Sequence, residues 1–191
     1  MINLYQNYYE ESNLLRRKEL DHCRSCNIQN PKLNVQQIKS NKRLTFTDFF
    51  QAINKITKPD DINVIANLDI IFDDSIDLAK NMHYNDFYCL TRYDLINNEP
   101  VFYNRAVSQD VWIWKGEIKG VFGDFELGQL GCDNKLAFEA RKATYNVSNP
   151  SLSIKTYHLH ESGFRNYKKE DVIAGPYLHL EPVFLSSKVL F

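Results

Sequence analysis

The chain has 191 residues, 43% of them hydrophobic, with 23 basic and 24 acidic side chains and a net charge of −1. This length fits one domain, spanning residues 1–191, with a core of its own. There is no basic excess to neutralise a nucleic-acid backbone, no apolar run near the roughly 20 residues that cross a bilayer, and the acidic, aromatic N-terminus is unlike a signal peptide. We therefore expect a cytoplasmic protein without a membrane span and without a nucleic-acid partner.

The four cysteines, at positions 23, 26, 89 and 132, are not expected to form disulfides without a secretory signal. Cys23 and Cys26 have CxxC spacing, which occurs in redox sites and in halves of zinc sites. The sequence holds no second CxxC, and the motif lies in a helix-like stretch. We favour the interpretation that both cysteines are ordinary parts of a helix, with a redox or zinc role as the alternative.

Apolar periodicity and turn residues divide the chain into alternating strands and helices. In chain order we expect a strand at 2–9, a helix at 13–26, a strand at 33–38, a helix at 48–56, strands at 62–65, 87–93 and 110–114, a helix at 134–144 and a strand at 153–158. Ser12 is predicted to cap the first helix, Thr45 or Thr47 the second, and Asp74 a short later one. The order indicates an α/β fold with a mixed, mostly parallel sheet and helices on both faces.

Asp69 lies just beyond the carboxyl end of the apolar run 62–65, a position where open α/β sheets bind ligands. Asn67 and Asp69 point the same way along an extended segment, and both offer hard oxygens that suit Mg²⁺ or Mn²⁺. The alternative interpretation is an ordinary strand end followed by a polar turn. Asp73 is a second candidate ligand for the same metal.

Asp133 follows two glycines and opens a predicted helix. The glycines allow the backbone to approach a ligand closely, and the acid can act as a general base toward an acceptor hydroxyl or simply cap the helix. Asp110 precedes an aromatic strand and is a second catalytic candidate, which could bind sugar hydroxyls while Trp112 stacks on the ring. For that segment, a half-buried strand with an outward carboxylate is the alternative.

His158 and His160 alternate along a predicted strand, so both side chains lie on one face of it. Either could complete the shell of a metal bound at Asp69, and a structural role is the alternative. Arg165 follows closely, and its guanidinium group matches the oxygens of a diphosphate. These residues extend the predicted metal and phosphate site into the C-terminal part of the chain.

Five segments together carry a resemblance to a known family. In chain order they are IANLDIIFDDSI, CLTRYD, SQDVWIWKG, DFELGQLGCDNKLAFEA and NPSLSIKTYHLHESGFRNY. They resemble a family of glycosyltransferase domains found in large DNA viruses and bacteria, related to the chlorella-virus rhamnosyltransferase domain that decorates capsid glycans. The resemblance covers the chain from Ile2 to about Pro182, and DNK and HLHESGFRNY are its most specific parts.

The resemblance implies a GT-A fold, which is a Rossmann-like sheet that binds a nucleotide sugar at its carboxyl edge. It implies a metal-binding DxD element at Asn67-Leu68-Asp69, with asparagine in place of the first aspartate. Asp69 is then the main anionic ligand for Mn²⁺ or Mg²⁺. The resemblance also implies a catalytic or acceptor-orienting role for Asp133 and a late metal or phosphate ligand at His158 or His160.

The resemblance further implies where the donor lies. The first strand is expected to flank the nucleotide base, and the segment RLTFTDFF is expected to lie near the nucleotide. Together with the residues singled out above, the expected substrate-binding residues are Leu4, Tyr5, Gln6, Arg43, Thr45, Asp48, Asn67, Leu68, Trp112, Asn134 and Arg165.

The function predicted from these residues and from the resemblance is metal-dependent sugar transfer. The donor is expected to be a UDP- or GDP-sugar and the acceptor a hydroxyl group on a glycan, with an inverting, hexosyltransferase type of reaction. The alternative is a non-catalytic module of a larger protein that binds a sugar nucleotide or a glycan. A metal-dependent phosphohydrolase that uses Asp69, Asp73 and the two histidines is disfavoured, because the acids form no dense two-metal cluster.

Overall fold

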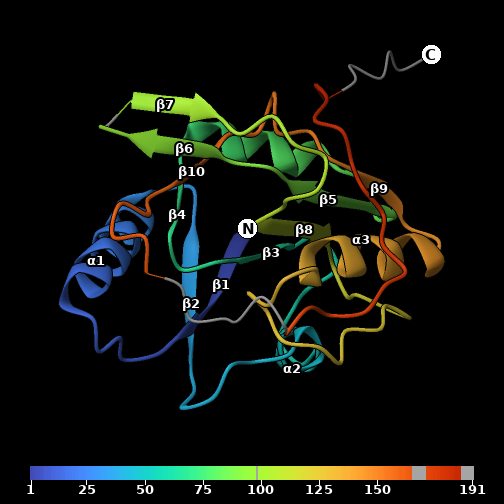
Figure 1. The fold of residues 1–191 in the computed structure, drawn as a ribbon. Coiled ribbons are helices and arrows are strands. Elements are labelled where there is room, and N and C mark those ends of the chain that lie inside the picture. The colour runs from blue at the N-terminus through green and yellow to red at the C-terminus, as the bar shows by residue number, and fades with distance from the viewer. Residues whose placement is uncertain (98, 165–170, 186–191) are drawn as a thin grey trace.

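The computed structural model describes residues 1–97, 99–164 and 171–185, which form an α/β fold with two sheets (Figure 1). The large sheet has the spatial order β2-β1-β3-β8-β5-β9. Its bounds are β1 Ile2–Tyr8, β2 Asn34–Lys39, β3 Ile62–Ala66, β5 Asp86–Leu90, β8 Val111–Lys115 and β9 Asn146–Ser148. The small sheet has the order β4-β10-β6-β7, with β4 Ile70–Phe72, β6 Tyr93–Ile96, β7 Glu99–Phe102 and β10 Thr156–His158.

The α/β prediction is confirmed, but the sheets are mixed rather than mostly parallel. In the large sheet, β1 pairs parallel with β2 and β3, and β5 pairs parallel with β9. β8 runs antiparallel to both of its neighbours, β3 and β5. Across the described strands, four pairings are parallel and four are antiparallel. Most of β8 is buried on both faces, as parallel strands usually are, so its apolar sequence does not reveal its direction.

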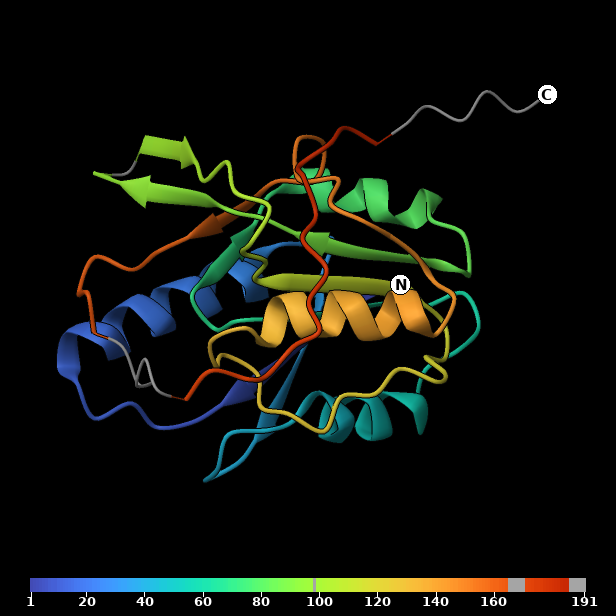
Figure 2. The same cartoon turned by 45° about the vertical axis from the view of Figure 1, so that its right-hand side comes forward.

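Helices cover both faces of the large sheet, as predicted. On one face, α2 (Phe46–Asn54) and α3 (Cys132–Lys142) pack over the indole rings of Trp112 and Trp114. Figure 2 shows α3 lying across this face. The segment 171–185 passes over α3 (Figure 2), and the backbone N–H of Leu178 donates to the carbonyl of Asn134 at 3.0 Å in the first turn of the helix. This segment therefore closes one side of the region where α3 begins.

The opposite face is covered by a different set of elements. The 3₁₀ helix η1 (Asp74–Asn81) and β4 pack there against Val64 and Val111. The long helix α1 (Leu14–Gln29) contacts β4 and β2. No helix in the part of the chain that the structure describes is long and apolar enough to cross a bilayer.

α2 begins two residues earlier than predicted because Thr45 is its cap. The Thr45 side chain accepts a hydrogen bond from the backbone N–H of Asp48 at 3.1 Å, and the Asp48 carboxylate accepts from the backbone N–H of Thr45 at 2.9 Å. This reciprocal capping box satisfies two donors at the start of the helix. Four apolar residues on one face of α2 are buried: Phe46, Phe49, Phe50 and Ile53.

Two other predicted caps are displaced by one residue. α1 is capped by Asn13 rather than Ser12, because Oδ1 of the Asn13 side chain accepts hydrogen bonds from the backbone N–H groups of Leu15 and Arg16. η1 is capped by Asp73 rather than Asp74. Asp73 also accepts a hydrogen bond from the hydroxyl of Tyr157 at 2.8 Å, which ties η1 to β10.

The CxxC pair lies within α1, one turn of helix apart. Cys23 is buried, Cys26 is partly exposed, and all four cysteines of the chain are free. Neither residue belongs to the group of possible metal ligands found among the described residues. The pair is therefore placed as part of an ordinary helix.

The strand directions bring several chain segments to one edge of the large sheet. The carboxyl ends of β1, β2, β3 and β5 lie at this edge, and so does the amino end of the antiparallel β8. Side chains that follow the four strands, or precede β8, therefore meet there.

Candidate metal centre

A cleft of about 890 Å³ opens along this edge. It is lined by segments that follow β1, β2, β3 and β10, by the segment before β8, and by the start of α3. Predicted site residues that line it are Arg43, Asn67, Leu68, Asp69, Asp110, Asp133, Asn134, His158 and His160. This cleft is therefore the candidate site.

Asp69 is the centre of a buried charged cluster. Its Oδ2 atom accepts a hydrogen bond from Nε2 of His158 at 3.1 Å and lies 3.8 Å from Nδ1 of His160. The same oxygen forms an ion pair with the guanidinium group of Arg16. Among the described residues, neither Oδ1 of Asp69 nor Nε2 of His160 has a hydrogen-bond partner, although both atoms are buried. One oxygen and one nitrogen therefore remain available to a ligand.

Strand pairing brings this cluster together. Asp69 lies between β3 and β4, and β10 pairs antiparallel with β4 so that His158 lies opposite Ile70. The backbone N–H of Leu159 donates to the carbonyl of Asp69 at 3.0 Å, which continues the ladder past the ends of the strands. Arg16 reaches the cluster from the first turn of α1. Three distant parts of the chain therefore meet at Asp69.

The charges of the cluster support one another. Burial raises the pKa of Asp69, but the hydrogen bond from His158 and the nearby ring of His160 outweigh the effect of burial and hold that pKa well below its usual range. Burial lowers the pKa of His158, but hydrogen bonds to Asp69 and Asp94 raise it to about 9. Burial raises the pKa of Asp94, but the hydrogen bond from His158 and a nearby guanidinium group lower it to about 2. Without a metal, His158 is therefore an imidazolium between two carboxylates.

Asp69, His158 and His160 could hold a divalent metal ion. One ligand atom from each lies within 4.8 Å of the others, so small rotations of the side chains would bring all three atoms to the distance of about 2 Å from one ion that coordination needs. Two imidazoles and a carboxylate suit a transition metal better than Mg²⁺, which prefers oxygen ligands. Arg16 occupies only Oδ2 of Asp69, so the unpartnered Oδ1 fits this donor set. Of the two expected ions, Mn²⁺ fits these side chains better.

Asp110 is bound into the wall of the cleft through both of its oxygens. Oδ1 accepts a hydrogen bond from the amide of Asn67 at 2.9 Å, and Oδ2 accepts one from Arg92 at 2.7 Å. Arg92 also donates to Asp94 at 2.8 Å and to the hydroxyl of Ser108 at 3.2 Å. Because its oxygens are engaged, Asp110 is better placed to organise the cleft than to accept a proton.

Asp133 lies in the cleft at the first turn of α3. Its Oδ2 accepts a hydrogen bond from the backbone N–H of Gln109 at 3.2 Å, and its Oδ1 accepts from the backbone N–H of Asn134 at 2.9 Å. Burial outweighs these hydrogen bonds and raises the pKa of Asp133 to about 6. The side chain of Asn134 donates to the carbonyl of Val107 at 3.0 Å and fixes the loop before β8. A carboxylate with a pKa near neutrality suits general-base chemistry.

The predicted residues of the first strand do not line the cleft. Leu4, Tyr5 and Gln6 are buried within β1. Tyr8, at the end of the strand, and Tyr9, just beyond it, line the cleft instead. The cleft begins where the strand ends, and residues inside the strand are covered by the layers on its two faces.

Three further predicted residues lie outside the cleft, and a fourth is not among the described residues. Thr45 and Asp48 form the capping box of α2 and do not line the cleft. Trp112 has no exposed surface. Its ring makes an edge-to-face contact with the ring of Phe46, and the two centroids are 4.8 Å apart. It fills the core because its face of β8 is covered by α2 and α3, so no ring face is offered to a sugar. Arg165 lies outside the described residues.

The sequence reasoning missed Arg16, Arg92 and Asp94. Arg92 and Asp94 belong to the segment CLTRYD, which carries part of the resemblance but has no predicted role. A signal existed there, because two opposite charges come within four residues of the end of an apolar strand at this edge of the sheet. Arg16 is the first of two adjacent arginines, and nothing local shows which of the two becomes buried beside a carboxylate.

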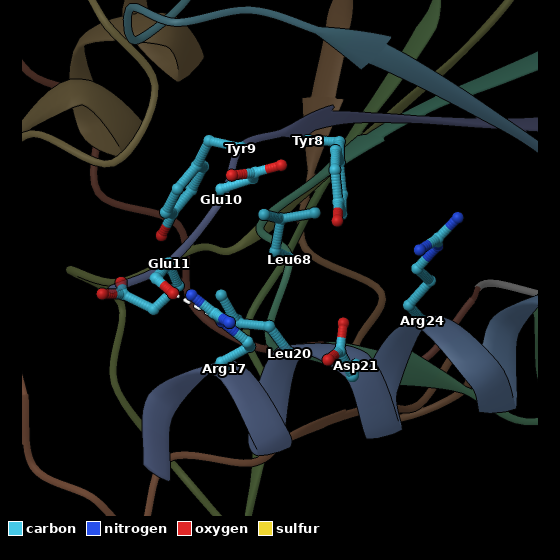
Figure 3. A pocket seen from close by; sticks show the side chains of 9 residues that line it. All are labelled: Tyr8, Tyr9, Glu10, Glu11, Arg17, Leu20, Asp21, Arg24 and Leu68. Carbon is cyan, nitrogen blue, oxygen red and sulfur yellow. Dashed lines mark hydrogen bonds between the residues drawn. The ribbon is translucent and has the colours of Figure 1, made fainter. Parts of the chain in front are cut away.

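A smaller pocket of about 200 Å³ adjoins the cleft, between the end of β1 and α1 (Figure 3). Leu68 lies near its centre, Tyr8 and Tyr9 approach it from β1, and Asp21 and Arg24 project from α1. Both tyrosines and Leu68 line the cleft as well. The pocket is therefore a side chamber of the cleft. One of its lining residues, Leu68, directly precedes Asp69 in the sequence.

No protein-family model matches the chain, and no curated protein matches it in sequence. Any proposal of function therefore rests on the fold, on the chemistry of this cleft and on the resemblance of the segments quoted above.

Proposed function

We propose that this chain is a metal-dependent glycosyltransferase that moves a sugar from a nucleoside-diphosphate sugar to a hydroxyl group on a glycan. One observation carries the proposal: a single cleft holds both the Asp69-His158-His160 group and Asp133, a carboxylate whose pKa is about 6. The first can bind the ion that a diphosphate needs, and the second can take a proton from an acceptor. The resemblance to the viral and bacterial glycosyltransferase family supports the same function.

The diphosphate is proposed to lie between the charged cluster and the end of β2. A bound ion supplies Lewis-acid chemistry that offsets the negative charge of a leaving diphosphate. Lys39, Lys42 and Arg43 follow or end β2 and line the same cleft. Their positive charge favours a polyanionic ligand over a neutral one.

Asp133 is proposed as the general base of an inverting transfer. The acceptor oxygen attacks the anomeric carbon, the bond to the diphosphate oxygen breaks, and its electron pair leaves with the diphosphate. The acceptor proton passes to the carboxylate of Asp133. The backbone N–H groups of Gln109 and Asn134 hold this carboxylate in place throughout.

The nucleoside is proposed to enter the side chamber beyond β1 rather than to lie along β1 itself. Tyr8, Tyr9 and Leu68 offer aromatic and aliphatic surface to a planar base, and Asp21 and Arg24 offer polar groups to its edges (Figure 3). We further propose that the chain belongs to this glycosyltransferase family and has a GT-A fold. Its donor is proposed to be a UDP- or GDP-sugar, its reaction of hexosyltransferase type and its location cytoplasmic.

Thermal unfolding of the full chain with a panel of nucleotide sugars, each with and without Mn²⁺, tests the proposal. A true donor should raise the unfolding temperature only when Mn²⁺ is present, in proportion to its affinity. The same mixtures should release nucleoside diphosphate over time. Binding without release would replace the enzyme with a non-catalytic sugar-nucleotide module, and the absence of any metal-dependent shift would refute both.

The matched variants are Asp69→Asn and Asp73→Asn. Asp69 lies in the proposed metal group, whereas Asp73 caps η1 and holds Tyr157. Asparagine caps helices about as well as aspartate, so Asp73→Asn should keep the Mn²⁺-dependent shift while Asp69→Asn loses it. Loss of the shift in both variants would mean that it reports general stability and not the metal group.

A further inference from the structure

We propose that Asp94, clamped by Arg92, is a positioning residue that holds the ring of His158 with its Nε2 atom directed at the metal-binding position. This inference rests on the metal-dependent function proposed above. The small sheet brings these two residues together, because β6 carries Asp94 and β10 carries His158. The two residues are partners in the parallel register of these strands.

The two ring nitrogens of His158 face two different carboxylates. Nδ1 lies 2.9 Å from Oδ1 of Asp94, and Nε2 lies 3.1 Å from Oδ2 of Asp69. An ionised carboxylate only accepts hydrogen bonds, so Nδ1 must carry the proton in its contact with Asp94. Nε2 is then the nitrogen that can be offered to a metal. Ligating histidines are commonly oriented in this way by a carboxylate on the other nitrogen.

Asp94 is itself held in place by Arg92. The Nε atom of Arg92 donates to Oδ1 of Asp94 at 2.8 Å, and its Nη1 atom donates to Oδ2 of Asp110 at 2.7 Å. The guanidinium carbon also lies 4.5 Å from the ring centroid of Tyr103. The Arg92 side chain is only 14% exposed, so the clamp is fixed from several sides. Rotation of Asp94 away from His158 would break the ion pair with Arg92.

The neighbouring residue of β10 provides a natural control. Tyr157 is held by the carboxylate of Asp73 at 2.8 Å, just as His158 is held by the carboxylate of Asp94 at 2.9 Å. Successive residues of a strand point to opposite faces, so Asp73 supports the face of β10 that does not meet the charged cluster. Loss of either carboxylate removes one polar anchor of β10, but only one of them orients a proposed ligand.

The test is the affinity of the purified full chain for Mn²⁺, measured by electron paramagnetic resonance of the free ion. Asp94→Ala should weaken binding by about 10- to 100-fold, the usual effect of removing the partner of a ligating histidine. Asp94→Asn should fall between wild type and Asp94→Ala, because its side-chain carbonyl still accepts a hydrogen bond. Asp73→Asn should bind Mn²⁺ within about twofold of wild type.

Absorption of the Co²⁺-loaded protein provides a readout that a merely structural role would leave unchanged. The visible bands should change in Asp94→Asn, where the ring orientation of His158 is loosened, and should match wild type in Asp73→Asn. If wild type binds but Asp94→Ala and Asp94→Asn bind equally well with the same spectrum, the positioning role is refuted while the metal site stands. If wild type binds neither Mn²⁺ nor Co²⁺, the proposed function falls and this inference falls with it.

Discussion

Replacement of Asp133 by asparagine should make the protein more stable at neutral pH while it removes the proposed base. Burial raises the pKa of Asp133 from 3.8 to about 6 in the folded chain. The folded state therefore binds this proton more tightly than the unfolded state, and stability is lost as the pH rises from about 4 to about 6. A shift of about 2 pH units corresponds to about 3 kcal/mol of lost stability at neutral pH.

Asparagine avoids that cost because it carries no charge, but it also loses one acceptor. The backbone N–H of Gln109 now donates to Oδ2 of Asp133, and losing such a hydrogen bond costs about 1 kcal/mol. The variant should therefore be less stable than wild type by about 1 kcal/mol below pH ~4, and more stable by about 2 kcal/mol near pH ~7. The change of sign identifies the ionisation as the cause.

Urea unfolding of both proteins across this pH range measures the difference directly, provided that the slopes against urea agree. Asp124→Asn is the matched control, because Asp124 is an exposed carboxylate in the connection that leads to α3. Its difference from wild type should stay within about 0.5 kcal/mol at every pH. A difference for Asp133→Asn that does not vary with pH would show that the folded pKa is ordinary, and the assignment of Asp133 as base would lose its physical support.

Four further outcomes are expected. The kcat/KM for sugar transfer should fall about tenfold per pH unit below pH ~6, as Asp133 becomes protonated; a flat profile there would point to another base. Removing divalent ions with EDTA should abolish donor binding in a calorimetric titration, and added Mn²⁺ should restore it. Trp112→Ala should cost about 3–5 kcal/mol of unfolding free energy, since the side chain is fully buried; a loss of donor affinity with unchanged stability would contradict its place in the core. Thr45→Ala should cost about 1 kcal/mol, whereas Thr47→Ala should cost less than about 0.5 kcal/mol; equal costs in thermal unfolding would argue against the capping box.

Much of the fold could be predicted because its signals are local. The capping residue of α2 and its apolar face lie within ten residues of each other, so periodicity alone located the helix. Asp69 was found in the same way, as an acid directly after a buried strand. Predicted ends differ from the observed ones by up to three residues. The caps at Asn13 and Asp73 differ by one residue because neighbouring polar residues compete for the same cap.

The features that the sequence does not predict depend on contacts between distant parts of the chain. Asp69 meets Arg16 from 53 positions away and His158 from 89 positions away, and no local pattern records such pairs. β4, β6, β7 and β9 were not predicted, since three- and four-residue strands show too few alternations to stand out. The sequence predicts that Trp112 stacks on a sugar because its aromatic strand directly follows Asp110. In the structure, α2 and α3 cover one face of that strand, and η1 with β4 covers the other.

The charged cluster links the small sheet to the edge of the large sheet. Positive and negative groups alternate through hydrogen bonds and ion pairs in the order Arg16, Asp69, His158, Asp94, Arg92, Asp110. Each inner member of this series of side chains is neutralised by a partner on each side. Removing one partner of a buried ion pair leaves the other charge unpaired, at a cost of several kcal/mol. The first member lies in α1, the third and fourth lie on the small sheet, and the last precedes β8. The proposed metal group is thus held at the end of β3 by α1 and by the small sheet, neither of which pairs with β3, so disruption of the β6–β10 pairing should disturb metal binding before it disturbs the large sheet.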